Sequence, residues 1–201
     1  MQKLISIVGA SGVGKTALVE ALTKTGLFAT AYEQHAERPF QALFKTDNRY
    51  ALANQIDYLL LRAEQEKDMR ASPQIGLIDG GLDLDFHGFT RLFHSRGLLT
   101  EAEYDLCLRL YSLLRESLPP PEWIVALHAP QPVIRSRLAS RNRINIASAE
   151  DADMMSRYID EWLETFPKDR VRRIDVSYED EAYRDSVNTI LDWVGLPDRS
   201  D

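Results

Sequence analysis

A glycine-rich stretch near the start of the chain has the residue types and spacing that bind phosphate. It matches the pattern G-x-x-x-x-G-K-[ST] at every fixed position. Glycines let the backbone curl so that several N–H groups point at one phosphate group. We expect the lysine to reach the outer phosphates of ATP and the threonine hydroxyl to bind Mg²⁺. The expected phosphate-binding residues are Gly9, Ala10, Ser11, Gly12, Val13, Gly14, Lys15 and Thr16.

The sequence on either side of this loop favours phosphate binding over a chance glycine-rich turn. A β-branched and apolar run, Leu4–Val8, precedes the loop and is typical of a buried strand. Residues 17–24 follow as a predicted helix. A helix N-terminus directed at the loop adds a dipole that favours anions.

Asp79 is a candidate Mg²⁺ ligand, and the residues around it do not match a switch GTPase. Asp79 follows the predicted strand 75–78 and is expected to hold Mg²⁺ directly or through water. The alternative is a turn-forming aspartate, because Gly80 and Gly81 come next. The D-x-x-G spacing of a switch GTPase is missing here, and no N-K-x-D occurs anywhere in the chain.

Four arginines crowd one short stretch of an otherwise acidic chain, whose formal net charge is −7. Arg137 and Arg141 are four residues apart, so they share a face of the predicted helix 132–141. Guanidinium groups can stabilise the charge that spreads over a transferred phosphoryl group. The alternative is a solvated helix face. We favour a catalytic role for the cluster as a group, which consists of Arg135, Arg137, Arg141 and Arg143.

Three further side chains could contact an acceptor molecule. Glu33 ends the predicted strand 28–33, where a carboxylate could take a proton from an attacking hydroxyl. It could equally be a solvated acid at a strand end. Gln55 and Arg62 are seven residues apart on the predicted helix 51–70, and the Gln55 amide suits the edge of a nucleobase. The alternative for Gln55 is an exposed helix former.

Strands alternate with helices along the whole chain. The remaining predicted strands are 123–127 and 171–176, and the remaining predicted helices are 85–95, 100–117, 148–166 and 179–194. Pro39 is expected to break the chain. This alternation predicts a three-layer α/β fold of the P-loop kinase type, with a five-stranded parallel sheet. We expect one domain over residues 1–201, with a helical lid at about residues 135–148.

The composition is that of a soluble globular protein. The chain has 201 residues, of which 44% are hydrophobic and 27% charged, so it can bury a core without disulfides. A single cysteine, Cys107, excludes a disulfide within the chain. We see no secretory signal and no apolar run of membrane-spanning length. We therefore expect a cytoplasmic protein that binds neither a membrane nor a nucleic acid polymer.

Together these segments resemble the deoxynucleoside kinases of the bacterial deoxyadenosine/deoxyguanosine kinase type, over about residues 1–177. Residues 32–40 are similar to the family's E-P-V-x-x-N-P-F, and residues 49–62 to the helix with its base-reading glutamine. Residues 79–89 are similar to the segment that opens [DE]-R-S, and residues 174–177 to the last strand. Arg137, Arg141 and Arg143 fall on the family's lid arginines, R-x-x-x-R-x-R, which implies a catalytic role for these three.

The resemblance implies transfer of the γ-phosphoryl group of ATP to the 5′-hydroxyl of a deoxynucleoside, with a preference for purines, with Mg²⁺ and by a homodimer. Glu33 falls on the general base and Gln55 on the residue that reads the nucleobase. Asp85 falls on an acid near the base and Phe89 on an aromatic that stacks on it. Arg62 lies on the same substrate-binding helix.

The chain departs from the family at the sugar side and in the lid. Gly80 and Gly81 replace the arginine and serine, Phe44 stands near an expected tyrosine, and Ile144-Asn145-Ile146 replaces paired glutamates. Arg38 or Arg62 could compensate for the missing arginine. These departures leave two alternatives: a kinase of another small hydroxyl compound, and a non-catalytic ATP-binding homologue.

Overall fold

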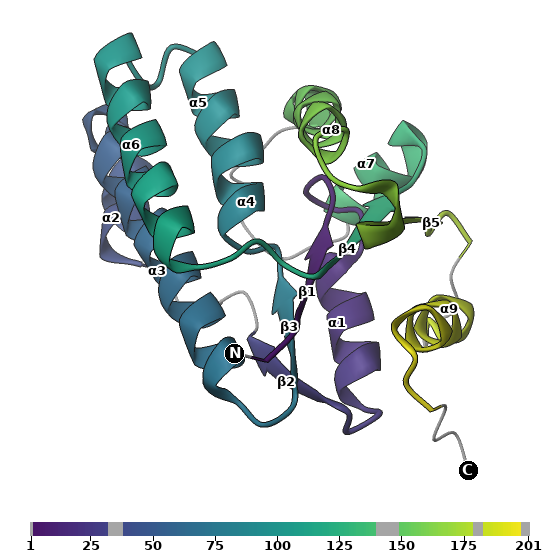
Figure 1. Cartoon of the computed structure of the whole chain (residues 1–201). Coiled ribbons are helices and arrows are strands. Elements are labelled where there is room, and N and C mark those ends of the chain that lie inside the picture. The colour runs from purple at the N-terminus through teal and green to yellow at the C-terminus, as the bar shows by residue number, and fades with distance from the viewer. Residues whose placement is uncertain (1, 32–37, 140–148, 179–182, 198–201) are drawn as a thin grey trace.

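The computed structural model describes residues 2–31, 38–139, 149–178 and 183–197 (Figure 1). Its strands are β1 (Leu4–Val8), β2 (Phe28–Ala31), β3 (Ile75–Asp79), β4 (Trp123–His128) and β5 (Val171–Asp175). Its α-helices are α1 (Lys15–Thr23), α2 (Pro39–Phe44), α3 (Ala51–Ala71), α4 (Leu82–Leu84), α5 (Arg91–Ser95), α6 (Glu101–Ser117), α7 (Gln131–Ala139), α8 (Ala149–Leu163) and α9 (Arg184–Val194). Two 3₁₀ turns, η1 (Asn48–Tyr50) and η3 (Lys168–Arg170), and a π-helical segment, η2 (Asp85–Thr90), complete the elements.

The sheet is parallel and confirms the predicted architecture. Its five strands run in the order β2-β3-β1-β4-β5. Every residue of the central strand β1 is buried, because helices cover both of its faces. Ile7 of β1 pairs with Asp79 of β3, so β1 and β3 end side by side. The loop that follows β1 therefore lies next to Asp79.

Helices cover the sheet in two outer layers. Helices α1 and α9 lie on one side, and α3 with α6 and the α4–α5 segment lie on the other (Figure 1). The core between β1 and α1 is entirely apolar and includes Ile5, Ile7 and Leu18. No helix in the described part of the chain is both long and apolar enough to cross a membrane.

Two helix starts differ from the prediction. Pro39 does not simply break the chain but begins α2, because a proline at the first helical position lacks an N–H that would have no partner there. The last helix was expected from residue 179, yet α9 begins at Arg184. Tyr183 precedes it in a left-handed conformation with φ of 51°, which cannot continue a helix. Residues 179–182 lie outside the described residues.

The predicted helix 85–95 begins earlier and contains an irregular segment. Helical structure starts at Leu82, and residues 85–90 form the wider π-helical segment η2. Such segments occur mainly as single turns within α-helices and are frequent at functional sites. Gly88 allows α8 to pack closely here, since a Cβ at this position would lie 2.9 Å from the Met155 Cε.

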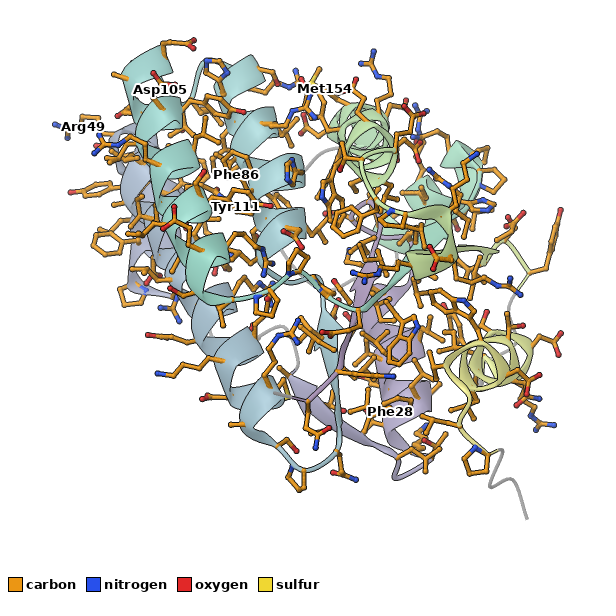
Figure 2. The ribbon with its side chains drawn as sticks, viewed as in Figure 1. Phe28, Arg49, Phe86, Asp105, Tyr111 and Met154 are labelled. Atoms are coloured by element: carbon orange, nitrogen blue, oxygen red, sulfur yellow. The ribbon has the colours of Figure 1, made fainter. Side chains whose placement is uncertain are left out.

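Aromatic side chains join η2 to α6 and α8. The rings of Phe86 and Tyr111 stack with centroids 4.3 Å apart, and both residues lie between α6 and the α4–α5 segment (Figure 2). His87 stacks on Trp162 of α8 at 5.4 Å, and its Nε2 lies 3.2 Å from the Tyr111 hydroxyl. Burial, with smaller contributions from Arg91 and Arg115, lowers the pKa of His87 from 6.5 to about 4.

This histidine predicts a loss of stability in mild acid. Below pH 6.5 the unfolded chain takes up a proton that the native His87 refuses until about pH 4, so the free energy of unfolding falls across this window. We expect a loss of about 3 kcal/mol from this group by pH 4. Urea unfolding at pH 7, 5.5 and 4 measures it, and His87→Gln should flatten the dependence. An unchanged slope in that variant would contradict the prediction.

Candidate nucleotide and acceptor site

The loop between β1 and α1 needs its glycines for both conformation and space. Gly9, Gly12 and Gly14 have φ values of 147°, 85° and 120°, which other residues rarely adopt. A Cβ at Gly12 would lie 2.7 Å from the Leu138 side chain of α7, and one at Gly14 would lie 2.5 Å from the Tyr183 hydroxyl. The loop is thus enclosed by α7 and Tyr183, which holds its backbone N–H groups in one arrangement.

The polar side chains of this loop gather at the carboxyl ends of β1 and β3. The Lys15 ammonium donates to the carbonyls of Gly9 and Ala10 at 3.0 and 3.2 Å, so it lies over the loop. The Thr16 hydroxyl donates to the Asp79 carboxylate at 2.7 Å, and Asp79 is buried. A hydroxyl and a carboxylate side by side are the hard oxygen ligands that Mg²⁺ prefers, so these two residues fit that ion.

Arg137 reaches the same loop from α7. Its guanidinium donates to the Val13 carbonyl at 2.6 Å and to the Val176 carbonyl at 2.7 Å. It therefore joins the phosphate loop to the segment that follows β5. In the sheet, β4 and β5 lie on one side of β1, and β3 with Asp79 lies on the other. The other two expected arginines, Arg141 and Arg143, lie outside the described residues.

A buried ion pair joins α3 to the segment that follows β3. The Arg62 Nε donates to the Asp85 carboxylate at 2.6 Å, and the two side chains are only 4% and 7% exposed. The Gln55 amide donates to the Asp85 backbone carbonyl at 3.3 Å. The structure thus brings together three of the expected substrate-binding residues. Gln55 is buried, so the alternative of an exposed helix former is wrong.

The departure at Gly80 is next to this pair. Gly80 has a φ of 90°, and a Cβ there would lie 3.8 Å from the Arg62 Nη2. Of the two arginines that could compensate, Arg62 is therefore the one placed beside the gap. Arg38 instead binds Asp57 of α3 through two hydrogen bonds of 2.5 and 2.6 Å.

Phe44 and Phe89, the two aromatic residues expected near the acceptor, pack in separate apolar clusters. Phe44, at the end of α2, packs against Phe93 with ring centroids 5.1 Å apart. Phe89 is half-buried and packs against the apolar cluster that includes Met155 of α8. Glu33 lies outside the described residues. The roles of these residues stay predictions.

Sequence reasoning missed two side chains that hold the turn between β3 and α4. The Ser6 hydroxyl donates to the Gly80 carbonyl at 2.5 Å, and the Glu66 carboxylate accepts the Leu82 N–H at 3.0 Å. Glu66 is four residues beyond Arg62 on α3, a spacing that could have placed it on the same buried face.

Comparison with known proteins agrees with this geometry. A family model described as deoxynucleoside kinase matches residues 5–194. The chain belongs to the deoxynucleoside kinase family. This confirms the family resemblance and, with it, the expected kinase class.

Two curated relatives carry related names. A deoxyadenosine kinase of Dictyostelium discoideum is 27% identical over 140 residues, which cover 69% of this chain and 57% of that relative. A deoxyadenosine/deoxycytidine kinase of Bacillus subtilis (strain 168) is 22% identical over 198 residues, which cover 95% of this chain and 91% of the relative. The kinase from D. discoideum thus extends well beyond the matched region.

Solved structures show the same fold. The deoxyadenosine kinase of M. mycoides with bound dCTP superposes with a TM-score of 0.78 at 17% identity, covering 96% of this chain and 98% of that one. Its structure with bound dATP gives the same TM-score and identity, covering 96% and 99% of the two chains. The five-stranded α/β architecture of this kinase family is therefore confirmed.

Proposed function

We propose that this kinase transfers the γ-phosphoryl group of ATP to the 5′-hydroxyl of a deoxynucleoside. The observation that carries the proposal is the buried pair of Arg62 and Asp85, with Gln55 bonded to the same residue. Charged groups are rarely buried without a task, and Asp85 lies six residues beyond Asp79, the carboxylate that accepts a hydrogen bond from Thr16 of the phosphate loop.

Each end of the site has a distinct task in this reaction. The backbone N–H groups of residues 9–14 and the Lys15 ammonium bind the phosphates, and their positive charge stabilises the charge of the transferred group. Thr16 and Asp79 would hold Mg²⁺, which neutralises phosphate charge when bound. Arg137 supports the loop, and with Arg141 and Arg143 it completes the proposed arginine set.

At the acceptor end, Glu33 takes the proton of the 5′-hydroxyl as that oxygen attacks the γ-phosphorus. Gln55 and Asp85 bind the nucleobase, Phe89 stacks on it, and Phe44 lines the sugar side without a hydroxyl to offer. Arg62 supplies the positive charge next to Gly80. We propose a cytoplasmic location, where ATP and free deoxynucleosides are both present.

We propose purine deoxynucleosides as the preferred acceptors, because deoxyadenosine appears in the names of the curated relatives and of the similar structures. The test is a panel of deoxynucleosides and ribonucleosides with labelled ATP and Mg²⁺. Deoxyadenosine or deoxyguanosine should give the highest kcat/KM. If no nucleoside yields a labelled monophosphate, the proposed acceptor is wrong.

We further propose that two copies of the chain associate through α3 and α6. These neighbouring helices expose large apolar side chains: Leu60 of α3 is 43% exposed, and Leu106 and Leu113 of α6 are 43% and 61% exposed. Leu106 and Leu113 are seven residues apart and so share one helix face. An apolar face of this kind is typical of an interface between subunits.

Glutamates introduced on this apolar face should dissociate the proposed dimer. We expect the protein to have twice the chain mass of 22.9 kDa in light scattering, and Leu106→Glu with Leu113→Glu to give the single-chain mass. Burying two glutamates in an apolar interface costs far more than a dimer can lose. A wild-type protein that is monomeric at micromolar concentration, or a charged variant that remains dimeric, would contradict this proposal.

A further inference from the structure

Helix α3 carries a row of buried polar side chains that faces the rest of the molecule. Gln55, Arg62, Glu66 and Arg70 are spaced by seven, four and four residues, and each is at most 4% exposed. Arg62 and Gln55 contact Asp85 in the proposed acceptor site. The next residue in the row, Glu66, lies one turn further along and belongs to a second set of buried charges.

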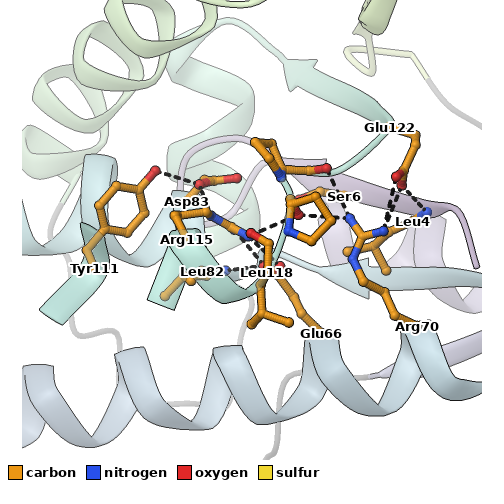
Figure 3. Close-up of polar contacts among 12 residues, drawn as sticks. Leu4, Ser6, Glu66, Arg70, Leu82, Asp83, Tyr111, Arg115, Leu118 and Glu122 are labelled. Carbon is orange, nitrogen blue, oxygen red and sulfur yellow. Dashed lines mark hydrogen bonds and ion pairs between the residues drawn. The ribbon is translucent and has the colours of Figure 1, made fainter. Parts of the chain in front are cut away.

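That second set joins three helices (Figure 3). Both carboxylate oxygens of Glu66 accept hydrogen bonds from Arg115 of α6, at 2.7 and 2.9 Å. The Arg115 Nε donates to the Asp83 carboxylate of α4 at 2.9 Å, and the Tyr111 hydroxyl donates to the same oxygen at 2.7 Å. The other Asp83 oxygen is buried and has no hydrogen-bond partner among the described residues.

Glu66 also fixes the backbone at the start of α4. Its Oε1 accepts the Leu82 N–H at 3.0 Å, directly after two glycines with φ of 90° and 98°. These glycines have no side chains that could hold the turn, so its position depends on hydrogen bonds from outside. The Ser6 hydroxyl donates to the Gly80 carbonyl, and the Gly80 N–H donates to the Ile7 carbonyl at 2.9 Å. The Glu66 carboxylate accepts the Leu82 N–H.

Two links thus connect the same two segments. Arg62 binds Asp85, and one turn away Glu66 binds the Leu82 N–H and, through Arg115, Asp83. Since Leu82 and Asp85 are three residues apart in one continuous helical segment, a displacement of the first turn moves the Asp85 carboxylate. Burial alone would lower the pKa of Arg115, but Asp83 and Glu66 outweigh it and raise that pKa, so the guanidinium stays charged.

We propose that Glu66 and Arg115 are positioning residues for the acceptor. They hold the Gly80–Gly81 turn and the start of α4 against α3, and so keep Asp85 and Arg62 in the geometry that binds the deoxynucleoside. This inference rests on the proposed function. It assigns to Arg115 of α6 an indirect effect on acceptor binding, through Glu66 and the start of α4.

The chain offers a matched control for Glu66. Glu122 also accepts hydrogen bonds from one arginine, Arg70, and from one backbone N–H, that of Leu4 at 2.7 Å (Figure 3). This second glutamate lies at the opposite end of the sheet, where β1 begins. Glu66→Gln and Glu122→Gln therefore make the same chemical change to a carboxylate that binds one arginine and one backbone N–H. The first is 1% exposed and lies beside the acceptor segment, and the second is 31% exposed and lies where β1 begins.

The experiment compares the two variants by steady-state kinetics and by hydrogen exchange. In Glu66→Gln the KM for the deoxynucleoside should rise about tenfold, and kcat/KM should fall by up to ~10²-fold, as small misplacements of binding groups can cause. The KM for ATP should stay within about twofold, because the donor contacts are untouched. The Leu82 amide should lose exchange protection. In Glu122→Gln neither the acceptor KM nor exchange at Leu82 should change.

An unchanged acceptor KM in a folded Glu66→Gln protein would overturn the inference, and so would an equal rise in Glu122→Gln. If Glu66→Gln does not fold, Tyr111→Phe removes one hydrogen bond to Asp83 while keeping the ring, and the acceptor KM should rise about two- to tenfold. No rise there would overturn the inference as well. A wild-type protein that phosphorylates no nucleoside would overturn the proposed function alone, and exchange at Leu82 would still decide whether Glu66 holds this turn.

Discussion

Replacing Glu33 by glutamine should lower kcat by about 10²- to 10⁴-fold, the usual contribution of a general base. The amide has nearly the shape of the carboxylate but cannot accept the proton of the 5′-hydroxyl. The KM for ATP should remain nearly unchanged, because the phosphates bind to the loop of residues 9–16. Rates with labelled ATP and saturating deoxynucleoside, together with ATP titration by fluorescence or calorimetry, measure both quantities.

The topology supports a base at this position. β2 ends at Ala31, and Ala31 pairs with Ile78, one residue before Asp79. The chain therefore leaves β2 at the edge of the sheet where the phosphate loop and Asp79 lie. Glu37→Gln is the matched control, since it makes the same change four residues later at a position without a proposed role. Equal turnover of Glu33→Gln and the wild type would remove Glu33 from the mechanism.

The donor side of the site could be predicted because its chemistry is local in sequence. The phosphate loop, its lysine and its threonine are consecutive residues, and the apolar run before them predicts the central strand. Asp79 was expected at the end of a strand, and the parallel register of β1 and β3 brings it to Thr16. The start of α6 is local in the same sense, since Thr100 and Glu103 are three residues apart and form a capping box.

The charge cluster beneath the acceptor segment could not be predicted because its partners are distant in sequence. Glu66 and Arg115 are separated by 49 residues, and Arg115 and Asp83 by 32. In the sequence Glu66 and Arg70 have the i, i+4 spacing of an ordinary exposed ion pair on a helix. Only the fold shows that both are buried with other partners, Glu66 with Arg115 of α6 and Arg70 with Glu122, which precedes β4.

The π-helical segment and Tyr183 were missed for a related reason. Nothing in the residue types of Asp85–Thr90 distinguishes a π-helical segment from a regular helix, and its position is set by packing against α6 and α8. Tyr183 adopts a left-handed backbone that its residue type disfavours, which tertiary packing around the phosphate loop compensates. Both features lie where the chain meets the proposed site.

Replacing Arg62 by leucine should destabilise the fold by about 3–5 kcal/mol and also abolish acceptor binding. The substitution leaves the Asp85 carboxylate buried at 7% exposure without the guanidinium that neutralises it, and an unpaired buried charge is among the most costly changes in a protein core. Denaturant unfolding at pH 7 measures the loss. Arg49→Leu, which breaks an exposed pair with Asp47, is the control and should leave the unfolding midpoint unchanged.

A double variant separates the stability effect from the functional one. Arg62→Leu combined with Asp85→Leu removes both charges, so most of the lost stability should return, because a buried ion pair can often be replaced by apolar side chains at little cost. Activity should not return, since the groups that bind the acceptor are absent from this variant, while ATP should still protect the protein against thermal unfolding. A double variant with restored stability and wild-type kcat/KM would show that the pair only holds α3 to η2. The opposite result is that stability is lost in the single variant and regained in the double variant, while neither variant turns over the deoxynucleoside. The buried pair then acts in acceptor binding, because a pair with a purely structural role is not needed once the fold is restored.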